Sequence, residues 1–330
     1  MNFIEIIRDA AAKREHLQSL TDAYRICNGQ ADGLGGVVID RYADNYQIQF
    51  FTDEFLRFEN EIAAAARELF AVKFLIVKYR MGGGVVGANC NSPIVGAGFK
   101  PALTAEHNGG HTIITENSLK FSVDLTDTLN PGLFLDMRDA RLAFAKLCEG
   151  KNVLNLFAYT CSFSVYARKF GALKAVSVDI SKKNLNKGRE NFLLNGIEPQ
   201  GGEFFCGSAE EYVDWCIKKE KKFGSVVIDP PSFAKNGKCT WSVAKNFENL
   251  LVKVVQILEE GGVLLACTNY SEWNNEILRK KVANAFAFNH KQAAILQEGT
   301  QGDDFPGTGM SKESCMSYSL WRSSGLTEKK

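Results

Sequence analysis

Hydrophobic side chains follow two different periods in the first part of the chain. Residues 2–17 and 54–70 space them as on the buried face of a helix, whereas 73–79 forms a short apolar run typical of a strand. Residues 31–51 contain two partly alternating apolar runs around a polar turn, which predicts a β-hairpin. The glycine-rich stretch that continues to about residue 105 predicts strand and loop. Together these elements predict a small α+β unit.

Further along the chain the pattern becomes a regular alternation of strands and helices. A pair of strands is predicted over 111–125, with its turn at Glu116–Ser118. Helix-length amphipathic segments then separate short apolar runs at 152–156, 174–178, 203–206, 225–229 and 262–267. Such alternation is typical of βαβ units, whose parallel sheet binds ligands at its carboxyl edge. We therefore expect a small α+β domain over 1–110 and a larger α/β domain over 111–330.

The composition changes this picture little. The chain has 330 residues, 45% of them hydrophobic and 23% charged, which is the balance of an ordinary globular protein. No apolar run approaches the roughly 18 to 20 residues that span a bilayer, and acidic residues near the N-terminus do not suit a signal peptide. We expect a soluble, cytoplasmic protein with no membrane partner.

The charge and the cysteines exclude some functions. A net charge of +1 shows no overall basic excess, so nucleic-acid binding would need a local patch. The nine cysteines include no CxxC pair and none near a histidine at ligand spacing. A zinc site or a disulfide framework is therefore disfavoured, and we expect no metal.

The ends of the first two strands of the larger domain suggest a cofactor site. Residues 157–161 form a short loop that opens a helix, and Asp179 ends the next strand about twenty residues later. An acidic side chain there suits hydrogen bonding to ribose hydroxyls, although an Asp at a strand end is as often a helix cap. A GxGxxG motif is absent and Cys161 stands where glycine would be preferred, so a nicotinamide dehydrogenase is poorly supported.

The fourth strand ends in a motif with more specific chemistry, DPPSF. Pro230 and Pro231 follow Asp229, fix the backbone φ angle and remove two amide donors, which leaves a stiff loop. Phe233 can then lie as a stacking surface. A carboxylate and carbonyls beside an aromatic ring suit a planar heterocycle, such as a base presented for methylation.

Five motifs of this chain resemble those of the class I S-adenosylmethionine-dependent methyltransferases, and among them the RlmI-type and RlmKL-type ribosomal RNA enzymes. These motifs are NPGLFLDMRDAR, NLFAYTCSFSVYA, VDIS, FFCGSAEEYV and DPPSF, and their order and spacing cover 113–322. The segment 23–51 is similar to the small central domain that precedes the catalytic domain in RlmI-type enzymes. The N-terminal PUA domain of many relatives has no counterpart in the match.

The resemblance implies a Rossmann-like, seven-stranded sheet, S-adenosylmethionine as cofactor and RNA, presumed ribosomal in this family, as substrate. It implies that one group closes over the cofactor, that a second lines its methionine end, and that a third holds the ribose and adenine. The group that closes over the cofactor is Phe134, Asp136 and Arg138, and the group at the methionine end is Asn155, Phe157, Tyr159 and Thr160. The group at the ribose and adenine is Asp179, Ile180, Ser208 and Ala209, and Asp229 is also expected beside the cofactor. Two positions depart from the family: Cys161 replaces a glycine, and Ser208 replaces an Asp beside the adenine.

The fifth strand ends with Cys267, which we expect across from Asp229. Carbon-5 of a pyrimidine is a poor nucleophile, and a thiolate that adds to carbon-6 activates it. The sequence therefore predicts cytosine-C5 methylation, with Cys267 as nucleophile and Asp229, Pro230, Pro231 and Phe233 holding the base. Lys235, Lys238 and Lys245 are candidates for phosphate contacts.

Several alternatives remain open from the sequence. The first is methylation of an exocyclic amine, guanine-N2 or adenine-N6, which needs no nucleophile and would leave Cys267 a buried, inert residue. The others are an RNA-binding protein with a degenerate cofactor site, and a methyltransferase for a small molecule or a protein. Monomer and homodimer are equally compatible with the sequence.

Overall fold

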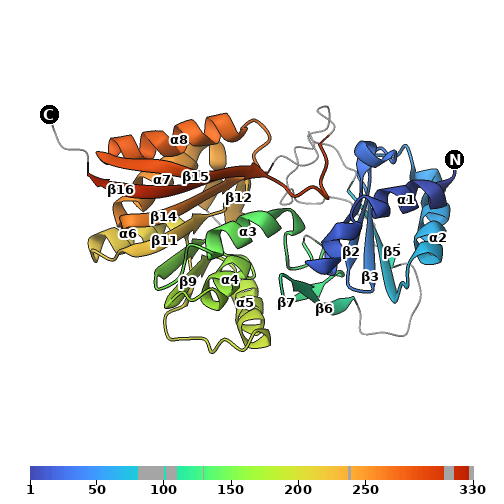
Figure 1. Ribbon diagram of the computed structural model, residues 1–330, viewed down its shortest axis with the longest axis horizontal. Coiled ribbons are helices and arrows are strands. Elements are labelled where there is room, and N and C mark those ends of the chain that lie inside the picture. The colour runs from blue at the N-terminus through green and yellow to red at the C-terminus, as the bar shows by residue number, and fades with distance from the viewer. Residues whose placement is uncertain (81–99, 102–109, 129, 237–238, 308–315, 327–330) are drawn as a thin grey trace. The chain divides into compact units, whose positions relative to one another are not determined.

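The computed structural model describes residues 1–80, 100–101, 110–128, 130–236, 239–307 and 316–326 (Figure 1). The chain divides by packing into two compact units. The first contains the described residues up to Asp136 and the segment that begins at Gly302, and the second contains Met137–Gln301 and the last strand. No helix among the described residues is long and apolar enough to cross a membrane.

A five-stranded sheet, counted over the described residues, forms the centre of the first unit, in the order β1-β2-β3-β4-β5. The apolar sides of helices α1 and α2 pack in one core with strand residues such as Ile39, Ile48 and Val77. The elements are α1 (Phe3–Ala12), β1 (Ala23–Asn28), β2 (Val37–Tyr42), β3 (Asn45–Phe50), α2 (Glu59–Leu69), β4 (Phe74–Tyr79) and β5 (Lys100–Pro101). The hairpin expected within 31–51 is confirmed as β2 and β3, which pair antiparallel across Ala43, a residue with a positive φ of 56°.

The hairpin of β6 (His111–Glu116) and β7 (Leu119–Asp124) packs with the first unit, whereas we had assigned these residues to the larger domain. The reason is a set of contacts to the start of the chain. Asp22 donates its amide to the carbonyl of Thr115 at 3.1 Å, and the Asp22 carboxylate accepts the Thr115 amide at 2.7 Å. Packing thus divides the chain after Asp136, and the roles that we assigned to the two domains stay predictions.

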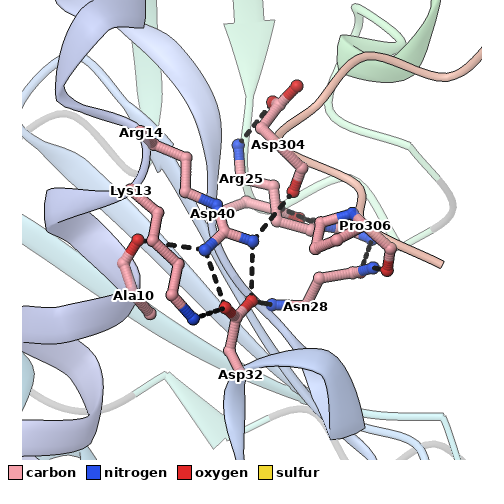
Figure 2. A network of polar contacts seen from close by, with 9 residues as sticks. All are labelled: Ala10, Lys13, Arg14, Arg25, Asn28, Asp32, Asp40, Asp304 and Pro306. Atoms are coloured by element: carbon pink, nitrogen blue, oxygen red, sulfur yellow. Dashed lines mark hydrogen bonds and ion pairs between the residues drawn. The ribbon is translucent and has the colours of Figure 1, made fainter. Parts of the chain in front are cut away.

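A segment from the far end of the sequence completes the first unit (Figure 2). Arg14 pairs with the carboxylate of Asp32 through two hydrogen bonds of 2.8 and 2.6 Å, and both side chains are buried. The amide of Arg25 donates to the carboxylate of Asp304 at 3.0 Å, and the Arg25 guanidinium lies 4.3 Å from the centre of the Phe305 ring. Residues 302–306 are therefore held by the N-terminal part of the chain.

Seven strands among the described residues form the sheet of the second unit, in the order β10-β9-β8-β11-β14-β16-β15. The first five in this order are parallel, and β16 is antiparallel to both β14 and β15. The strands are β8 (Asn152–Leu156), β9 (Lys174–Asp179), β10 (Phe204–Cys206), β11 (Phe223–Ile228), β14 (Leu258–Thr268), β15 (Lys291–Thr300) and β16 (Ser317–Leu326). The expected Rossmann-like, seven-stranded sheet is confirmed.

Helices cover both faces of this sheet. Apolar residues of α6, α7 and α8 form one core with Leu154, Leu156 and Ala266, and the intervening residue Asn155 faces α4 on the other side. The helices are α3 (Arg138–Ala145), α4 (Ser162–Lys169), α5 (Lys182–Leu194), α6 (Ala209–Lys218), α7 (Val243–Ile257) and α8 (Asn275–Phe288). A short hairpin of β12 (Phe233–Asn236) and β13 (Cys239–Ser242) follows β11.

Candidate functional site

Four parallel strands end level with one another at the carboxyl edge of the large sheet. Leu156 lies beside both Val178 and Ile228, and Ile228 lies beside Ala266. The next residues along these strands are Phe157, Asp179, Asp229 and Cys267. The sheet register therefore brings the expected cofactor and base residues to a single edge, as the alternating sequence pattern predicted.

The loop that follows β8 is built from left-handed backbone. Phe157, Tyr159 and Cys161 have φ angles of 61°, 48° and 62°. Non-glycine residues in such conformations cost about 1–3 kcal/mol each, and surrounding contacts must enforce them. Here the amide of Ala158 donates to the carbonyl of Val178 at 2.9 Å, and the Cys161 amide donates to Ala158 at 2.7 Å. The expected cofactor loop is a strained, hydrogen-bonded turn against the end of β9.

Asp179 links this loop to helix α5. One carboxylate oxygen accepts the Tyr159 amide at 2.8 Å, and the other accepts the Ser181 amide at 2.8 Å and the Asn184 side chain at 3.4 Å. Burial raises the pKa of Asp179 above its ordinary value, although these donors act in the opposite direction. An ionised carboxylate has about four acceptor positions, so room remains for a ribose hydroxyl. The adjacent Ile180 is 48% exposed, which leaves an apolar side chain beside it.

Cys161 occupies the left-handed position where the family has glycine. Its side chain fits because Gly188 of α5 lies opposite: a Cβ added at Gly188 would be 2.3 Å from the Cys161 sulfur. Burial raises the pKa of the Cys161 thiol to about 12, so it stays protonated. Glycine in the neighbouring helix thus supplies the space that the cysteine needs.

Two of the residues expected at the methionine end are buried. The Asn155 side chain donates to the Ser164 hydroxyl at 3.0 Å, and Ser164 hydrogen-bonds Ser177 at 2.8 Å, all three buried. Position 155 alternates with Leu154 and Leu156, so its side chain points toward α4. Thr160 is also buried. That Asn155 and Thr160 line the methionine end of the cofactor stays a prediction.

On the adenine side, the residues after β10 begin helix α6. The Ser208 hydroxyl accepts the amides of Glu210 and Glu211 at 3.2 and 3.4 Å, which makes it the N-cap, and Ala209 is buried. The Gly207 amide donates to the carbonyl of Asp179 at 3.0 Å. The serine that replaces the family's Asp therefore has a structural partner, and its segment adjoins Asp179.

The DPPSF loop is held from two directions by residues that sequence reasoning did not single out as supports. The Ser232 hydroxyl donates to the Asn269 side chain at 2.7 Å, and the Trp241 indole donates to the carbonyl of Pro231 at 2.9 Å. The Trp241 ring also packs against Phe157, with centroids 4.7 Å apart. Pro230 is buried, whereas Phe233 is 46% exposed. Hydrogen bonds therefore hold the loop at Pro231 and Ser232, and its aromatic ring is accessible.

Cys267 is fully buried in strand β14 and lies opposite Tyr318 of β16.

The three residues expected to close over the cofactor are divided between the units: Phe134 and Asp136 belong to the first, and the buried Arg138 begins α3 in the second. Of the lysines proposed for phosphate contacts, Lys245 is exposed, Lys235 lies in β12 and Lys238 lies outside the described residues. Among the described residues no cluster of His, Cys, Asp and Glu could hold a metal ion.

Relatives of known sequence match most of the chain. The pattern of the S-adenosylmethionine-dependent methyltransferase family matches residues 81–307. The putative ribosomal RNA large subunit methyltransferase YwbD of Bacillus subtilis is 32% identical over 307 residues, which cover 92% of this chain and 75% of the relative. Ribosomal RNA large subunit methyltransferase I of Aeromonas hydrophila is 31% identical over 317 residues, 93% of this chain and 75% of the relative.

Solved structures show the same fold. A putative methyltransferase complexed with SAH superposes with a TM-score of 0.84 at 26% identity, over 97% of this chain and 80% of that one. A putative SAM-dependent methyltransferase from Streptococcus mutans gives 0.82 at 25% identity, again over 97% and 80%. With the acidic side chain of Asp179 and its strained loop at the carboxyl edge, the residues present fit this cofactor. The protein is an enzyme whose cofactor is S-adenosylmethionine, and the chain belongs to the S-adenosylmethionine-dependent methyltransferase family.

Proposed function

We propose that this enzyme transfers the methyl group to a base of large-subunit ribosomal RNA in the cytoplasm. The observation that carries the proposal is the DPPSF loop: a strand-end carboxylate, two prolines and an exposed Phe233, braced by Asn269 and Trp241. A rigid loop with an accessible ring suits a planar base. Relatives that match over most of the chain are named for ribosomal RNA. The first unit would contribute RNA contacts and the second the transfer.

The methyl acceptor that we propose is carbon-5 of a cytosine, with Cys267 as nucleophile. When bound, S-adenosylmethionine supplies an electrophilic methyl group. The Cys267 thiol would lose its proton to water and add to carbon-6, which makes carbon-5 nucleophilic enough to accept the methyl group, with S-adenosylhomocysteine as the leaving product. Loss of the carbon-5 proton to water would then expel the thiolate. Asp229 would hold the amino edge of the base, since the sheet register sets it level with Cys267. The Asp179 carboxylate would orient the ribose.

A second candidate, methylation of an exocyclic amine, is favoured by the burial of Cys267. Its side chain is 0% exposed within a paired strand, whereas Asn269 comes after the strand and contacts the DPPSF loop. An amide and a carboxylate flanking an amine could position it without a nucleophile. The cytosine route requires the side chains that cover Cys267 on its face of the sheet to move enough for carbon-6 to reach the sulfur.

Replacement of Cys267 separates the two routes. Cys267→Ala should retain S-adenosylmethionine binding and lose methyl transfer by several orders of magnitude, because loss of covalent addition removes transition-state stabilisation. Nucleoside mass spectrometry of RNA from cells with and without the protein identifies the product. RNA with 5-fluorocytosine should trap the wild type covalently. An active Cys267→Ala variant, or an N-methylated product, would exclude the cytosine route.

A thermal shift with S-adenosylmethionine measures how well the folded chain binds this cofactor despite Cys161 and Ser208. A cofactor that binds only the folded chain stabilises it by mass action. We expect the melting temperature to rise with cofactor concentration. An unchanged melting temperature at every cofactor concentration would contradict tight binding by this loop.

A further inference from the structure

Tyr270 and Trp273 follow Asn269, the residue after β14 whose side chain accepts a hydrogen bond from Ser232 of the DPPSF loop. We call the surface that these two aromatic residues form the Tyr270–Trp273 platform. Their rings lie 5.7 Å apart and nearly perpendicular, at 84°. The Trp273 amide donates to the Tyr270 carbonyl at 2.9 Å, and the Tyr270 amide donates to the Thr268 hydroxyl at 3.1 Å. These bonds form a tight turn between the end of β14 and helix α8, and the platform has a fixed backbone.

The platform is anchored from below and partly open to solvent. Trp273 packs edge-on against Phe247 of α7 at 5.6 Å, and both platform residues pack against the large core while keeping exposed area. A hydrogen bond to Glu272 raises the pKa of Tyr270 and holds its hydroxyl. Both rings are partly exposed, which leaves aromatic surface for a ligand.

The charges around the platform are paired. Lys281 lies 4.4 Å from the centre of the Trp273 ring and pairs with Glu248, and Lys280 pairs with Glu276 at 2.7 Å. Such pairs leave little net positive charge to attract phosphate. A ligand that binds here would be recognised through its ring faces, and its affinity would depend weakly on salt.

The platform adjoins the DPPSF loop through a hydrogen bond. Asn269, which accepts the Ser232 hydroxyl of the DPPSF loop, immediately precedes Tyr270. We propose that an unpaired nucleotide next to the target base stacks on the Tyr270–Trp273 platform and so positions the RNA strand. This inference rests on the proposed RNA substrate and adds the residues that bind the neighbouring nucleotide.

Another aromatic surface supplies a matched control. Trp241 and Trp321 are buried, and Trp215 of α6 is 41% exposed with Lys221 4.8 Å from its ring centre. Trp215 therefore has the same combination of ring and lysine as Trp273. It lies on a helix that covers one face of the sheet, with no contact to the DPPSF loop among the described residues. Proximity to the loop is what distinguishes Trp273.

Steady-state methyl transfer to an in vitro transcript of large-subunit ribosomal RNA tests the proposal. Trp273→Leu keeps an apolar side chain and removes the stacking face, so the KM for RNA should rise about tenfold with kcat within twofold. Trp273→Phe should recover most of the loss, and Trp215→Leu should match the wild type. The salt dependence of KM should be unchanged. Melting curves and cofactor affinity show whether each variant is folded. Tyr270→Leu replaces Trp273→Leu in the experiment if the latter does not fold.

The outcomes separate this inference from the proposed function. Wild-type transfer with an unchanged KM in Trp273→Leu and Tyr270→Leu would overturn the platform and leave the RNA substrate standing. A KM that rises in Trp215→Leu instead would move the RNA to α6 and also overturn it. A wild type that methylates no RNA, yet binds S-adenosylmethionine, would refute the proposed function itself.

Discussion

Asp179 shows how one side chain serves both structure and cofactor binding. Its carboxylate fastens the strained loop through the Tyr159 amide and keeps capacity for a ribose hydroxyl. Asp179→Ala removes charge-assisted hydrogen bonds, each worth ~1.5 to 3 kcal/mol, so S-adenosylmethionine should bind at least tenfold more weakly in calorimetry. An affinity equal to that of the wild type would mean that the ribose binds elsewhere.

The raised pKa of Asp179 gives this binding a pH dependence. Hydroxyl donors favour the ionised carboxylate, so bound cofactor lowers the pKa that burial has raised. Affinity should therefore be constant above the raised pKa and fall as the pH drops through it. Asp179→Asn, which cannot ionise, should show a flat profile over the same acidic range. Parallel slopes for the two proteins would assign the pH dependence to another group.

At the scale of elements, the loop after β8 packs against helix α5 through Cys161 of the loop and Gly188 of the helix. Gly188→Ala would place a Cβ 2.3 Å from the Cys161 sulfur, and this overpacking should cost about 1–3 kcal/mol of unfolding free energy. Cys161→Gly suits the left-handed φ and removes the opposing atom, so the double variant should regain most of that loss. Denaturant unfolding of the single and double variants measures the coupling. Additive losses would show that the two positions are independent.

The order of strands and helices along the chain also predicts where the candidate site lies. Strands at 152–156, 174–178 and 225–229 could be predicted because each is a short apolar run whose period depends on neighbouring residues alone. Parallel pairing then sets Asp179, Asp229 and Cys267 at one edge. Alternation within each strand decides the face to which a side chain points, so Asn155, between Leu154 and Leu156, faces α4.

At the scale of the whole molecule, the segment between β15 and β16 joins distant parts of the sequence. The buried Asp304 carboxylate accepts the amide of Arg25, 279 positions earlier (Figure 2). The Phe305 ring centre lies 4.3 Å from the guanidinium of the same arginine. Asp304→Ala leaves that amide without its acceptor and should lower the unfolding free energy by about 1–3 kcal/mol. Asp303→Ala, an exposed neighbour, is the control. Equal denaturation midpoints for both variants would show that the contact contributes nothing to stability.

The sequence by itself determined the fold class, the cofactor family and the position of the DPPSF loop, because hydrophobic period and short motifs are local properties. It carried no signal for the pairs Cys161–Gly188, Ser232–Asn269 and Arg25–Asp304. Each pair joins residues that only chain folding brings within contact distance, so local patterns cannot encode it. The tertiary structure also decided that Cys267 is buried, since its exposure depends on β16, which pairs with it from the far end of the chain.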